Sequence, residues 1–581
     1  MCIIQTFISC LQYKERRAVF TVLRKGRKEV KIRMTEKINL AGNPFYLTGE
    51  QIKWVEDAYQ KLTVKQKIGQ LFCVMGQDYS IEELTNMAAE QGVGAVLYRP
   101  APSGEIRENY ARLDEAAPVP LLKAANLEEG GAGGTAEGTL FGWPMMVAAT
   151  DDLSMAEKFA QVCAAEGRET GINWTFSPVS DLDLNFMNPI TNVRSYGSSL
   201  KRVMAFTEVY MKTVQECGVA ACAKHFPGDG VDFRDHHLHP TYNSLSSEEW
   251  YASYGRIYQN MIDKGLLSIM AGHIVQPNVA MKKNPDLTIG QCLPASQSRE
   301  LLTGVLREEF HFNGVITTDA TIMGGYCMTM PRREAIVASV MAGSDMLVFN
   351  TDFQEDYQYM MDALESGALT EERLNEAVLR VLALKAAVCQ KVFVQPETDA
   401  RGWHRECADK AVTLVKDIQH ILPVTTDKYS VIRLIVIGRD DIRGKSMTAT
   451  AVSYLEQEGF RVEVYEPLRD DLHGSKGLPG DRLTLYLANM ETASNQTTVR
   501  IGWCPKHALE IPRFVMEEDA IFVSFANPYH LQDIPRIRTY INAYTATEDS
   551  IYAVLDKIMG KSEFKGVSPV DAFCGLTDTR L

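Results

Sequence analysis

The chain has 581 residues and a mass of 64.9 kDa, more than one hydrophobic core accommodates, so we expect at least two domains. A formal net charge of −14 at pH 7 argues against a nucleic-acid-binding protein, because such proteins present a basic face to phosphates. Twelve cysteines lie scattered without a CxxC pair, and no window approaches the roughly 18 apolar residues that a membrane-spanning helix needs. We therefore expect a cytoplasmic protein with no nucleic-acid partner and no membrane span.

Residues 1–33 differ from the rest of the chain, because they carry nine Lys or Arg and only two Asp or Glu. The apolar stretch MCIIQTFISC precedes these charges, whereas a signal peptide has them in the opposite order. The sequence MTEKINLAGNPF, from Met34, is typical of a protein start. We predict that residues 1–33 are a disordered or spurious N-terminal extension.

Short apolar runs alternate with amphipathic stretches of helical periodicity, such as residues 153–169, over the next part of the chain. Eight βα units over about 280 residues are typical of a (β/α)8 barrel of the TIM type, and an open doubly wound sheet is the alternative. The runs are QLFCVMG (70–76), GAVLYR (94–99), LLKAAN (121–126), WTFSPVS (174–180), AACAKHF (220–226), LSIMAGHI (267–274), GVITTDA (314–320) and DMLVFN (345–350).

A second α/β pattern begins after residues 395–406, which read as a linker. We predict a barrel domain over 40–394 and a smaller α/β sandwich domain over 407–581, making the chain an α/β protein. The apolar runs of the second domain are 431–438, 461–466, 483–490, 520–528 and 537–544.

Polar residues close several of the predicted barrel strands, and the C-terminal ends of barrel strands are where active sites gather. We therefore expect one pocket that several of these side chains share. The polar strand-end residues are Asn126, Lys224, His225, His273, Asp319 and Asn350.

The glycine-rich stretch EEGGAGGTAEG (128–138) follows the third run. Such a stretch can bring backbone N–H groups to a phosphate, but its spacing matches neither GxGxxG nor a Walker loop. A flexible loop that contacts the substrate is the interpretation we prefer to a nucleotide site.

Residues 224–240, KHFPGDGVDFRDHHLHP, contain four of the eleven histidines and three aspartates. A zinc site is one interpretation, but ligands need rigid orientation and this segment is punctuated by proline and glycine. Proton transfer by Asp235 and His237 is favoured, because the carboxylate can orient an imidazole whose pKa lies near neutrality. We expect no metal and no cofactor, and we interpret His236 and His239 as loop neighbours.

Asp319 ends the seventh run and is the best candidate for the group that reacts with the substrate. A nucleophilic carboxylate with a separate acid/base is the retaining glycosidase arrangement. The alternative is that Asp319 caps a helix beginning in the segment TIMGG.

These motifs resemble the bacterial β-N-acetylglucosaminidases of glycoside hydrolase family three, whose loop reads K-H-F-P-G-x-G-x4-D-x-H. Residues 405–570 resemble the sandwich domain of the two-domain members. The other resembling stretches are LTVKQKIGQLF (62–72), GINWTFSPVSDLDLNFMNPITNVRSYGSS (171–199), PASQSRELLTGVLREEFHFNGVITTDA (294–320) and AGSDMLV (342–348).

The resemblance implies roles for individual residues. Asp319 would be the nucleophile, and His237, assisted by Asp235, the general acid/base. The residues expected to bind sugar hydroxyls are Lys224, His225, Arg194 and Asn126. The glycines of the loop would then act as hinges that let His237 close over the substrate.

The resemblance also implies the reaction, a retaining exo-β-glycosidase that hydrolyses terminal β-linked N-acetylglucosamine, with a carbohydrate as partner and a role in peptidoglycan turnover. The sequence departs from the family pattern at several positions. Asn126 stands where relatives have a sugar-binding Asp, and an Arg of the same motif is absent. Asp229 stands where relatives often have His, and His236 where they have Ser. The alternatives are another β-hexosidase, a glycoside phosphorylase of the same family, or a sugar-binding homologue without turnover.

Overall fold

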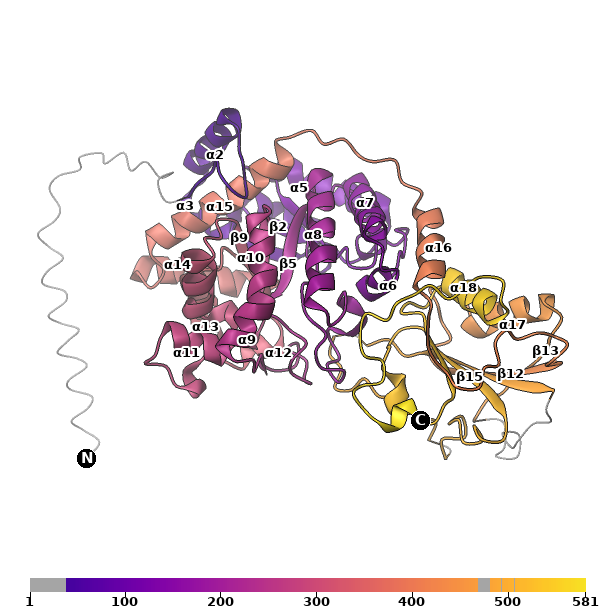
Figure 1. Ribbon diagram of the computed structural model, residues 1–581. Coiled ribbons are helices and arrows are strands. Elements are labelled where there is room, and N and C mark those ends of the chain that lie inside the picture. The colour runs from indigo at the N-terminus through magenta and orange to yellow at the C-terminus, as the bar shows by residue number, and fades with distance from the viewer. Residues whose placement is uncertain (1–37, 469–480, 493, 506) are drawn as a thin grey trace, which may run out of the picture. The chain divides into compact units, whose positions relative to one another are not determined.

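The computed structural model describes residues 38–468, 481–492, 494–505 and 507–581 (Figure 1). The predicted extension, residues 1–33, lies outside the described residues. Residues 40–581 form one compact unit.

Eight parallel strands close into a barrel in the order β1-β10-β9-β7-β5-β4-β3-β2. Each strand lies within one of the eight predicted runs, so the (β/α)8 prediction is confirmed and the open doubly wound sheet is wrong. The strands are β1 (Phe72–Met75), β2 (Ala95–Leu97), β3 (Leu122–Ala125), β4 (Trp174–Thr175), β5 (Ala220–Phe226), β7 (Ser268–Ala271), β9 (Val315–Ala320) and β10 (Met346–Val348).

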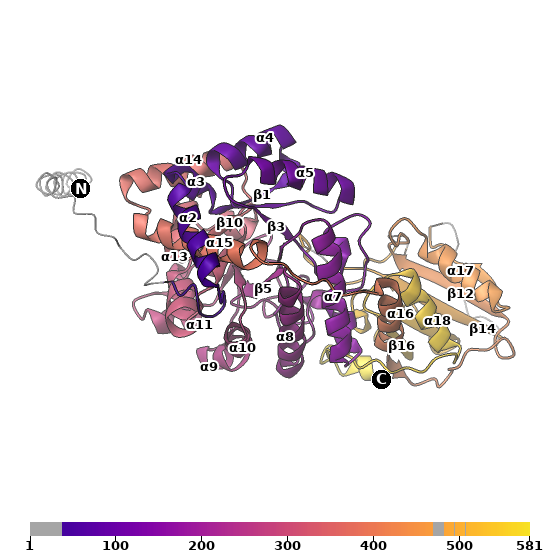
Figure 2. The ribbon, with the colours of Figure 1, turned by 90° about the horizontal axis from the view of Figure 1, so that it is seen from above.

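The barrel strands are buried on both faces, because helices cover them from outside (Figures 1 and 2). Helix α7 (Leu153–Glu169) coincides with the predicted amphipathic stretch. It begins at Asp152, whose side chain accepts a hydrogen bond from the backbone N–H of Ser154. Helix α8 (Leu200–Glu216) packs against both α7 and strand β5. The helical period thus places apolar residues on the barrel and charged residues in solvent.

The second domain contains a six-stranded sheet in the order β11-β16-β15-β14-β12-β13, in which only β11 runs antiparallel to its neighbour. Five of these strands overlap the predicted runs. Strand β11 was not predicted, because it is short and follows a helix without an intervening turn signal. The strands are β11 (Thr413–Asp417), β12 (Val431–Gly438), β13 (Arg461–Val464), β14 (Arg482–Asn489), β15 (Asp519–Ser524) and β16 (Thr539–Asn542).

The predicted linker, residues 395–406, contains the beginning of helix α16 (Ala400–Ala411). Asp399 starts this helix by accepting a hydrogen bond from the backbone N–H of Gly402. The segment without regular structure therefore runs from the end of α15 (Glu371–Cys389) to residue 399.

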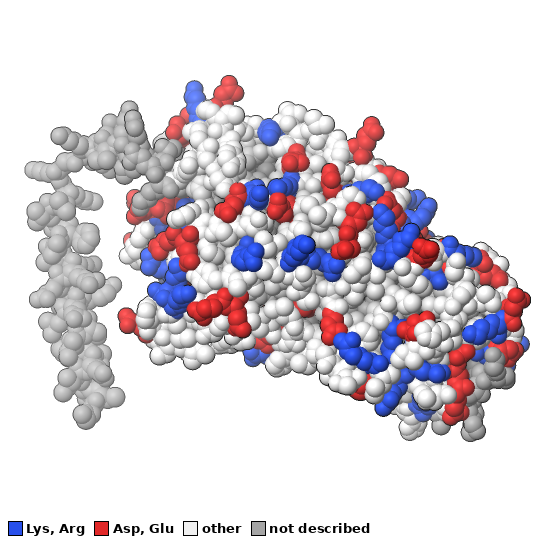
Figure 3. Space-filling model, in the orientation of Figure 1, with Lys and Arg blue, Asp and Glu red and all other residues white. Residues whose placement is uncertain are grey.

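Acidic and basic side chains are interspersed over the face drawn in Figure 3. Among the described residues, no helix has the length and apolarity that a membrane crossing requires.

Candidate active site

A cavity of about 660 Å³ opens at the C-terminal ends of the barrel strands and brings together most of the predicted site residues. Asp235 lies buried behind this lining, whereas His273 and Asn350 bond to other parts of the barrel and do not line the cavity. The predicted residues that line it are Asn126, Arg194, Lys224, His225, His237 and Asp319.

Glu128 is a buried carboxylate between two cations, Arg194 from the short turn Asn192–Arg194 and Lys224 from strand β5. Arg194 donates to it through Nε at 2.8 Å and Nη2 at 3.0 Å, and Lys224 Nζ pairs with the same carboxylate. Lys224 Nζ also donates to Asn126 Oδ1 at 3.2 Å. Burial by itself would raise the pKa of Glu128, but Arg194 and Lys224 hold it well below its usual range.

The glycine-rich loop that carries Glu128 is packed tightly, contrary to the predicted flexible loop. A Cβ added at Gly131 would lie 1.9 Å from Glu166 Oε2, and one at Gly133 would lie 1.7 Å from the carbonyl oxygen of Asn126. These glycines allow close backbone approach, so the loop is a rigid wall that holds a carboxylate. The spacing of the glycines could not indicate that Glu128 pairs with Arg194 and Lys224, because these partners are distant in sequence.

The Glu128→Gln variant is expected to lower the free energy of unfolding by about 3–5 kcal/mol, since it leaves two buried cations without their counter-charge. Because folding lowers the pKa of Glu128, its contribution is complete above its unfolded pKa of about 4.3 and is lost progressively as pH falls from there through the lowered folded pKa. Urea unfolding at pH 7 and at about pH 3 measures both effects. Glu82→Gln, which removes an exposed pair with Arg112, is the control and should change little.

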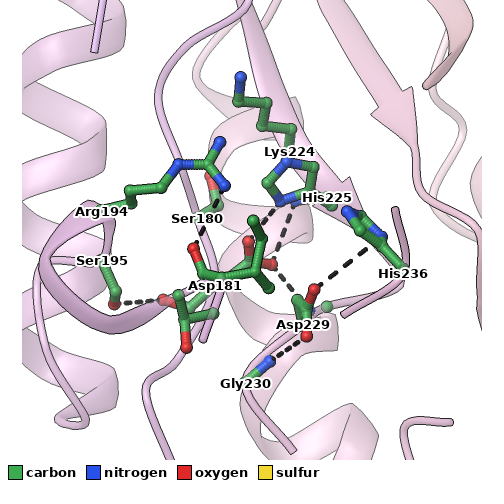
Figure 4. Close-up of polar contacts among 12 residues, drawn as sticks. Ser180, Asp181, Arg194, Ser195, Lys224, His225, Asp229, Gly230 and His236 are labelled. Carbon is green, nitrogen blue, oxygen red and sulfur yellow. Dashed lines mark hydrogen bonds and ion pairs between the residues drawn. The ribbon is translucent and has the colours of Figure 1, made fainter. Parts of the chain in front are cut away.

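Asp181 fixes the orientation of His225 and of the following turn (Figure 4). Its Oδ2 lies 2.6 Å from His225 Nδ1, and its Oδ1 accepts from the backbone N–H groups of His225 at 3.1 Å and Asp229 at 2.8 Å. With Nδ1 occupied, His225 keeps Nε2 for the cavity. Asp181 was not predicted as a site residue, although it closes the P-V-x-D turn that follows the fourth run.

The predicted acid/base pair, Asp235 and His237, is formed. His237 Nδ1 lies 2.7 Å from Asp235 Oδ1, and the backbone N–H of His237 donates to the same oxygen at 2.8 Å. Burial opposes ionisation of Asp235, but its hydrogen bonds with His237 lower its pKa below the ordinary value. The ring of His237 lines the cavity. Because Asp235 contacts Nδ1, Nε2 is the ring nitrogen left to exchange a proton with a bound ligand.

The second domain supplies residues to the cavity that no sequence motif indicated. Thr492, Ser494 and Asn495 line it, and the backbone N–H of Asn495 donates to Asp235 Oδ2 at 2.6 Å. Both oxygens of Asp235 are therefore engaged, one by the barrel loop and one by the second domain. This contact joins residues 260 positions apart, which no local pattern encodes.

Asn495→Pro is expected to reduce kcat/KM by about tenfold or more, because a hydrogen bond to a charged group contributes about 1.5–3 kcal/mol. Proline lacks the N–H, and its fixed φ cannot reach the value of +66° found at Asn495. Asn495→Gly keeps the N–H and tolerates positive φ, so it should retain the activity that the proline variant loses. Steady-state kinetics of both variants make the comparison, and equal losses would contradict a role for the N–H.

Asp319 is the penultimate residue of β9 and lies at the cavity floor. Its Oδ1 accepts from the backbone N–H of Ala320 at 2.7 Å, and Oδ2 is buried. Burial would raise the pKa of Asp319, but the surrounding imidazoles, His236 first among them, hold it below its usual range. The helix-cap alternative is wrong, because the next helix, α12 (Gly324–Cys327), begins after Met323 and has no side-chain cap.

His236 is more than a loop neighbour, because it is fully buried and lies 3.6 Å from Asp319. His239 is partly exposed. Its ring lies 3.4 Å from the carbonyl of Pro240, and its backbone N–H donates to the carbonyl of Asp235 at 3.4 Å. The loop glycines have φ of +118° at Gly228 and +94° at Gly230, and each packs closely against a neighbour. Their hinge motion stays a prediction.

Two sets of donor atoms lie within 4.8 Å of one another, a spacing that a metal ion could bridge: His225, His236 and Asp319, and Asp235, His236 and His237. In these sets His225 Nδ1 already pairs with Asp181, and His237 Nδ1 with Asp235. The spacing by itself therefore identifies no ligand set.

Comparisons with known proteins converge on one family. Residues 63–384 match the family described as "Glycosyl hydrolase family 3 N terminal domain". The chain is 38% identical over 572 residues to a protein of Cellulomonas fimi named "Beta-N-acetylglucosaminidase/beta-glucosidase", covering 94% of this chain and 100% of that one. A solved beta-glucoside phosphorylase, BglX, bound to 2FGlc, is 41% identical with a TM-score of 0.87, covering 93% of this chain and 100% of that one.

A solved family 3 beta-N-acetylglucosaminidase from Paenibacillus sp. has the same fold, with a TM-score of 0.74 at 24% identity, covering 89% of this chain and 100% of that one. The barrel, the second domain and the family match all indicate the same family. The chain is a glycoside hydrolase that belongs to family 3.

Proposed function

We propose that the chain is a retaining exo-β-glycosidase that releases terminal β-linked N-acetylglucosamine through a covalent glycosyl-enzyme on Asp319. The observation that carries the proposal is that Asp319 and His237, which Asp235 contacts from behind the lining, line one cavity with a cluster of polar groups that can bind hydroxyls. The name of the Cellulomonas fimi relative, which includes N-acetylglucosaminidase, supports the choice of sugar.

The reaction proceeds in two displacements. In the first, His237 gives its Nε2 proton to the leaving oxygen while the Asp319 carboxylate attacks the anomeric carbon. In the second, His237, now neutral, takes a proton from water as the water attacks the same carbon, and Asp319 leaves. Two inversions retain the configuration. Asp235 stabilises the imidazolium and keeps Nε2 directed at the reacting oxygen.

The hydroxyl-binding groups hold the sugar against Asp319. Lys224 and Arg194 present donors, which the Glu128 carboxylate fixes in place. His225 presents Nε2 because Asp181 holds Nδ1, and Asn126 presents an amide. These groups come from β3, β5 and the turn after β4, so the sugar is oriented by rigid elements.

Phosphorolysis is the second candidate, favoured by the similarity to the beta-glucoside phosphorylase, which extends over nearly the whole of both chains. After the first displacement His237 is neutral, so it does not repel an anionic acceptor as a carboxylate base would. Phosphate would then attack the glycosyl-enzyme in place of water and yield a sugar 1-phosphate.

The test is turnover of aryl β-N-acetylglucosaminides and aryl β-glucosides, each with and without inorganic phosphate, with the sugar product identified. The proposal expects faster turnover of the N-acetylglucosaminide and a free sugar that forms without phosphate. A sugar 1-phosphate with phosphate-dependent turnover would assign the second candidate. Preference for the glucoside would overturn the choice of sugar while leaving the chemistry intact.

A further inference from the structure

A chain of three buried side chains runs from the loop to the underside of Asp319. His236 Nε2 lies 3.6 Å from Asp319 Oδ2, and His236 Nδ1 lies 3.9 Å from Asp229 Oδ2 (Figure 4 draws the second contact). Among the described residues, these four atoms have no hydrogen-bond partner although all are buried. A buried polar atom without a partner is costly, and shortening the contact with Asp319 by about 0.4 Å and the contact with Asp229 by about 0.7 Å would bring both to bonding distance.

The surrounding backbone makes room for this imidazole. A Cβ added at Gly325 would lie 2.3 Å from the carbonyl oxygen of His236, and one at Gly272 would lie 3.3 Å from its Nδ1. Asp229 is equally constrained, because its Oδ1 accepts from the side chain of Asn188 at 2.9 Å and from the backbone N–H of Gly230 at 2.7 Å. Only Oδ2 of Asp229 is left for His236.

The charges that face His236 decide where a proton resides. Burial and the charge of Asp181 raise the pKa of Asp229 well above its ordinary value. Burial, together with the neighbouring His237 and His225, lowers the pKa of His236 well below its ordinary value. His273 also faces the ring from the end of β7, and Asp319 faces it from β9. Both directions favour a protonated Asp229 beside a neutral His236.

We propose that Asp229, as a neutral carboxylic acid, donates its proton in a hydrogen bond to His236 Nδ1 and thereby holds the His236 tautomer whose Nε2–H donates to Asp319 Oδ2. His236 is thus a positioning residue for the nucleophile, and Asp229 sets its tautomer. The inference rests on the proposed role of Asp319 as nucleophile.

This arrangement acts differently on the two displacements. A hydrogen bond to a carboxylate is stronger than one to a neutral ester oxygen. The Nε2–H of His236 therefore stabilises Asp319 when it is free more than when it carries the sugar. It keeps Asp319 ionised in the first step and favours its departure in the second.

The experiment compares His236→Asn, which has no donor at the Nε2 position, with His236→Gln, which has one. His236→Asn is expected to slow release of the sugar from Asp319 by about 10- to 100-fold and to bring an acid limb into the kcat/KM pH profile. His236→Gln should recover part of both. Rapid-quench kinetics with a 2,4-dinitrophenyl glycoside measure sugar release, and thermal unfolding verifies that each variant is folded.

Asp229 is tested by Asp229→Asn against Asp229→Ala. The amide of asparagine can donate to His236 Nδ1 as the carboxylic acid does, so Asp229→Asn should recover most of the activity that Asp229→Ala loses. Equal losses in the two variants would mean that Asp229 acts as an anion and would overturn the inference. His239→Gln, on the same loop, is the control and should leave the pH profile unchanged.

Labelling of the active site and chelation of metal ions distinguish the role of His236 from failure of the proposed function and from a metal site. Wild-type protein is treated with a 2-fluoro glycoside, and a label at a residue other than Asp319 would overturn the proposed function itself. A label on Asp319 together with an unmoved pH profile in His236→Asn would overturn only the role of His236. Loss of wild-type activity with EDTA, restored by a divalent metal, would assign the cluster to an ion and overturn the hydrogen-bonded chain.

Discussion

Asp319→Asn is expected to lower turnover of aryl β-glycosides on the order of 10⁴-fold, because the amide cannot form the glycosyl ester and removal of a covalent catalyst has effects of this size. The change is nearly isosteric, and the amide oxygen can still accept the N–H of Ala320. The cavity and its hydroxyl-binding groups should therefore survive, and the variant should still bind the sugar.

The measurements are initial rates and calorimetric titration with the product sugar. Unchanged binding with lost turnover is the expected combination. This combination distinguishes a nucleophile from a residue that only supports the fold. Loss of a purely structural residue would lower the thermal unfolding temperature, whereas Asp319→Asn should unfold close to the wild-type temperature. A wild-type chain that binds the sugar but turns over no aryl glycoside would instead favour the sugar-binding homologue.

His237→Gln is expected to have an effect that depends on the leaving group. For leaving groups that need protonation, such as a second sugar, kcat/KM should fall by about 10²- to 10⁴-fold, the range for loss of a general acid. For 2,4-dinitrophenol, which departs as a stable anion, the first displacement should change little. The second displacement should then limit the rate, because water has lost its base.

A series of aryl glycosides of graded leaving-group pKa measures this dependence, and added azide should speed the second displacement without needing a base. His239→Gln makes the same substitution two positions along the same loop and should change neither quantity. A uniform loss across all leaving groups would contradict the acid role. Asp235→Asn should give a weaker version of the same pattern, because the imidazole loses the carboxylate that stabilises its charged form.

The second domain contacts the proposed acid/base pair through Asp235. Asp235 Oδ2 is held by Asn495 and its Oδ1 by His237, so the proposed pair is oriented from both domains. Trp143 of the barrel donates to Glu491 of the second domain at 2.5 Å, beside the same cavity. Burial and the nearby Glu491 raise the pKa of Glu129 to about 7, against the opposing effect of Arg443. The carboxyl group of Glu129, which pairs with Arg443 of the second domain, therefore has a pKa of about 7.

The sequence by itself determined the barrel, the sandwich and the strand-end residues of the site. Alternating apolar runs and helical periods record burial locally, and parallel strands necessarily bring their C-terminal residues to one face. Lys224, His225 and Asp319 could be placed at the cavity for that reason. The pairing of Asp235 with His237 was also accessible, because the two residues lie two positions apart.

Only the tertiary structure decided how these residues are held. Glu128 meets Arg194 across 66 positions, Asp181 meets His225 across 44, and Asn495 meets Asp235 across 260. Such contacts depend on how elements pack, and a residue's neighbours in sequence carry no record of them. His236 shows the limit most clearly, since its position beside His237 suggested a loop residue, whereas packing buries it against Asp319.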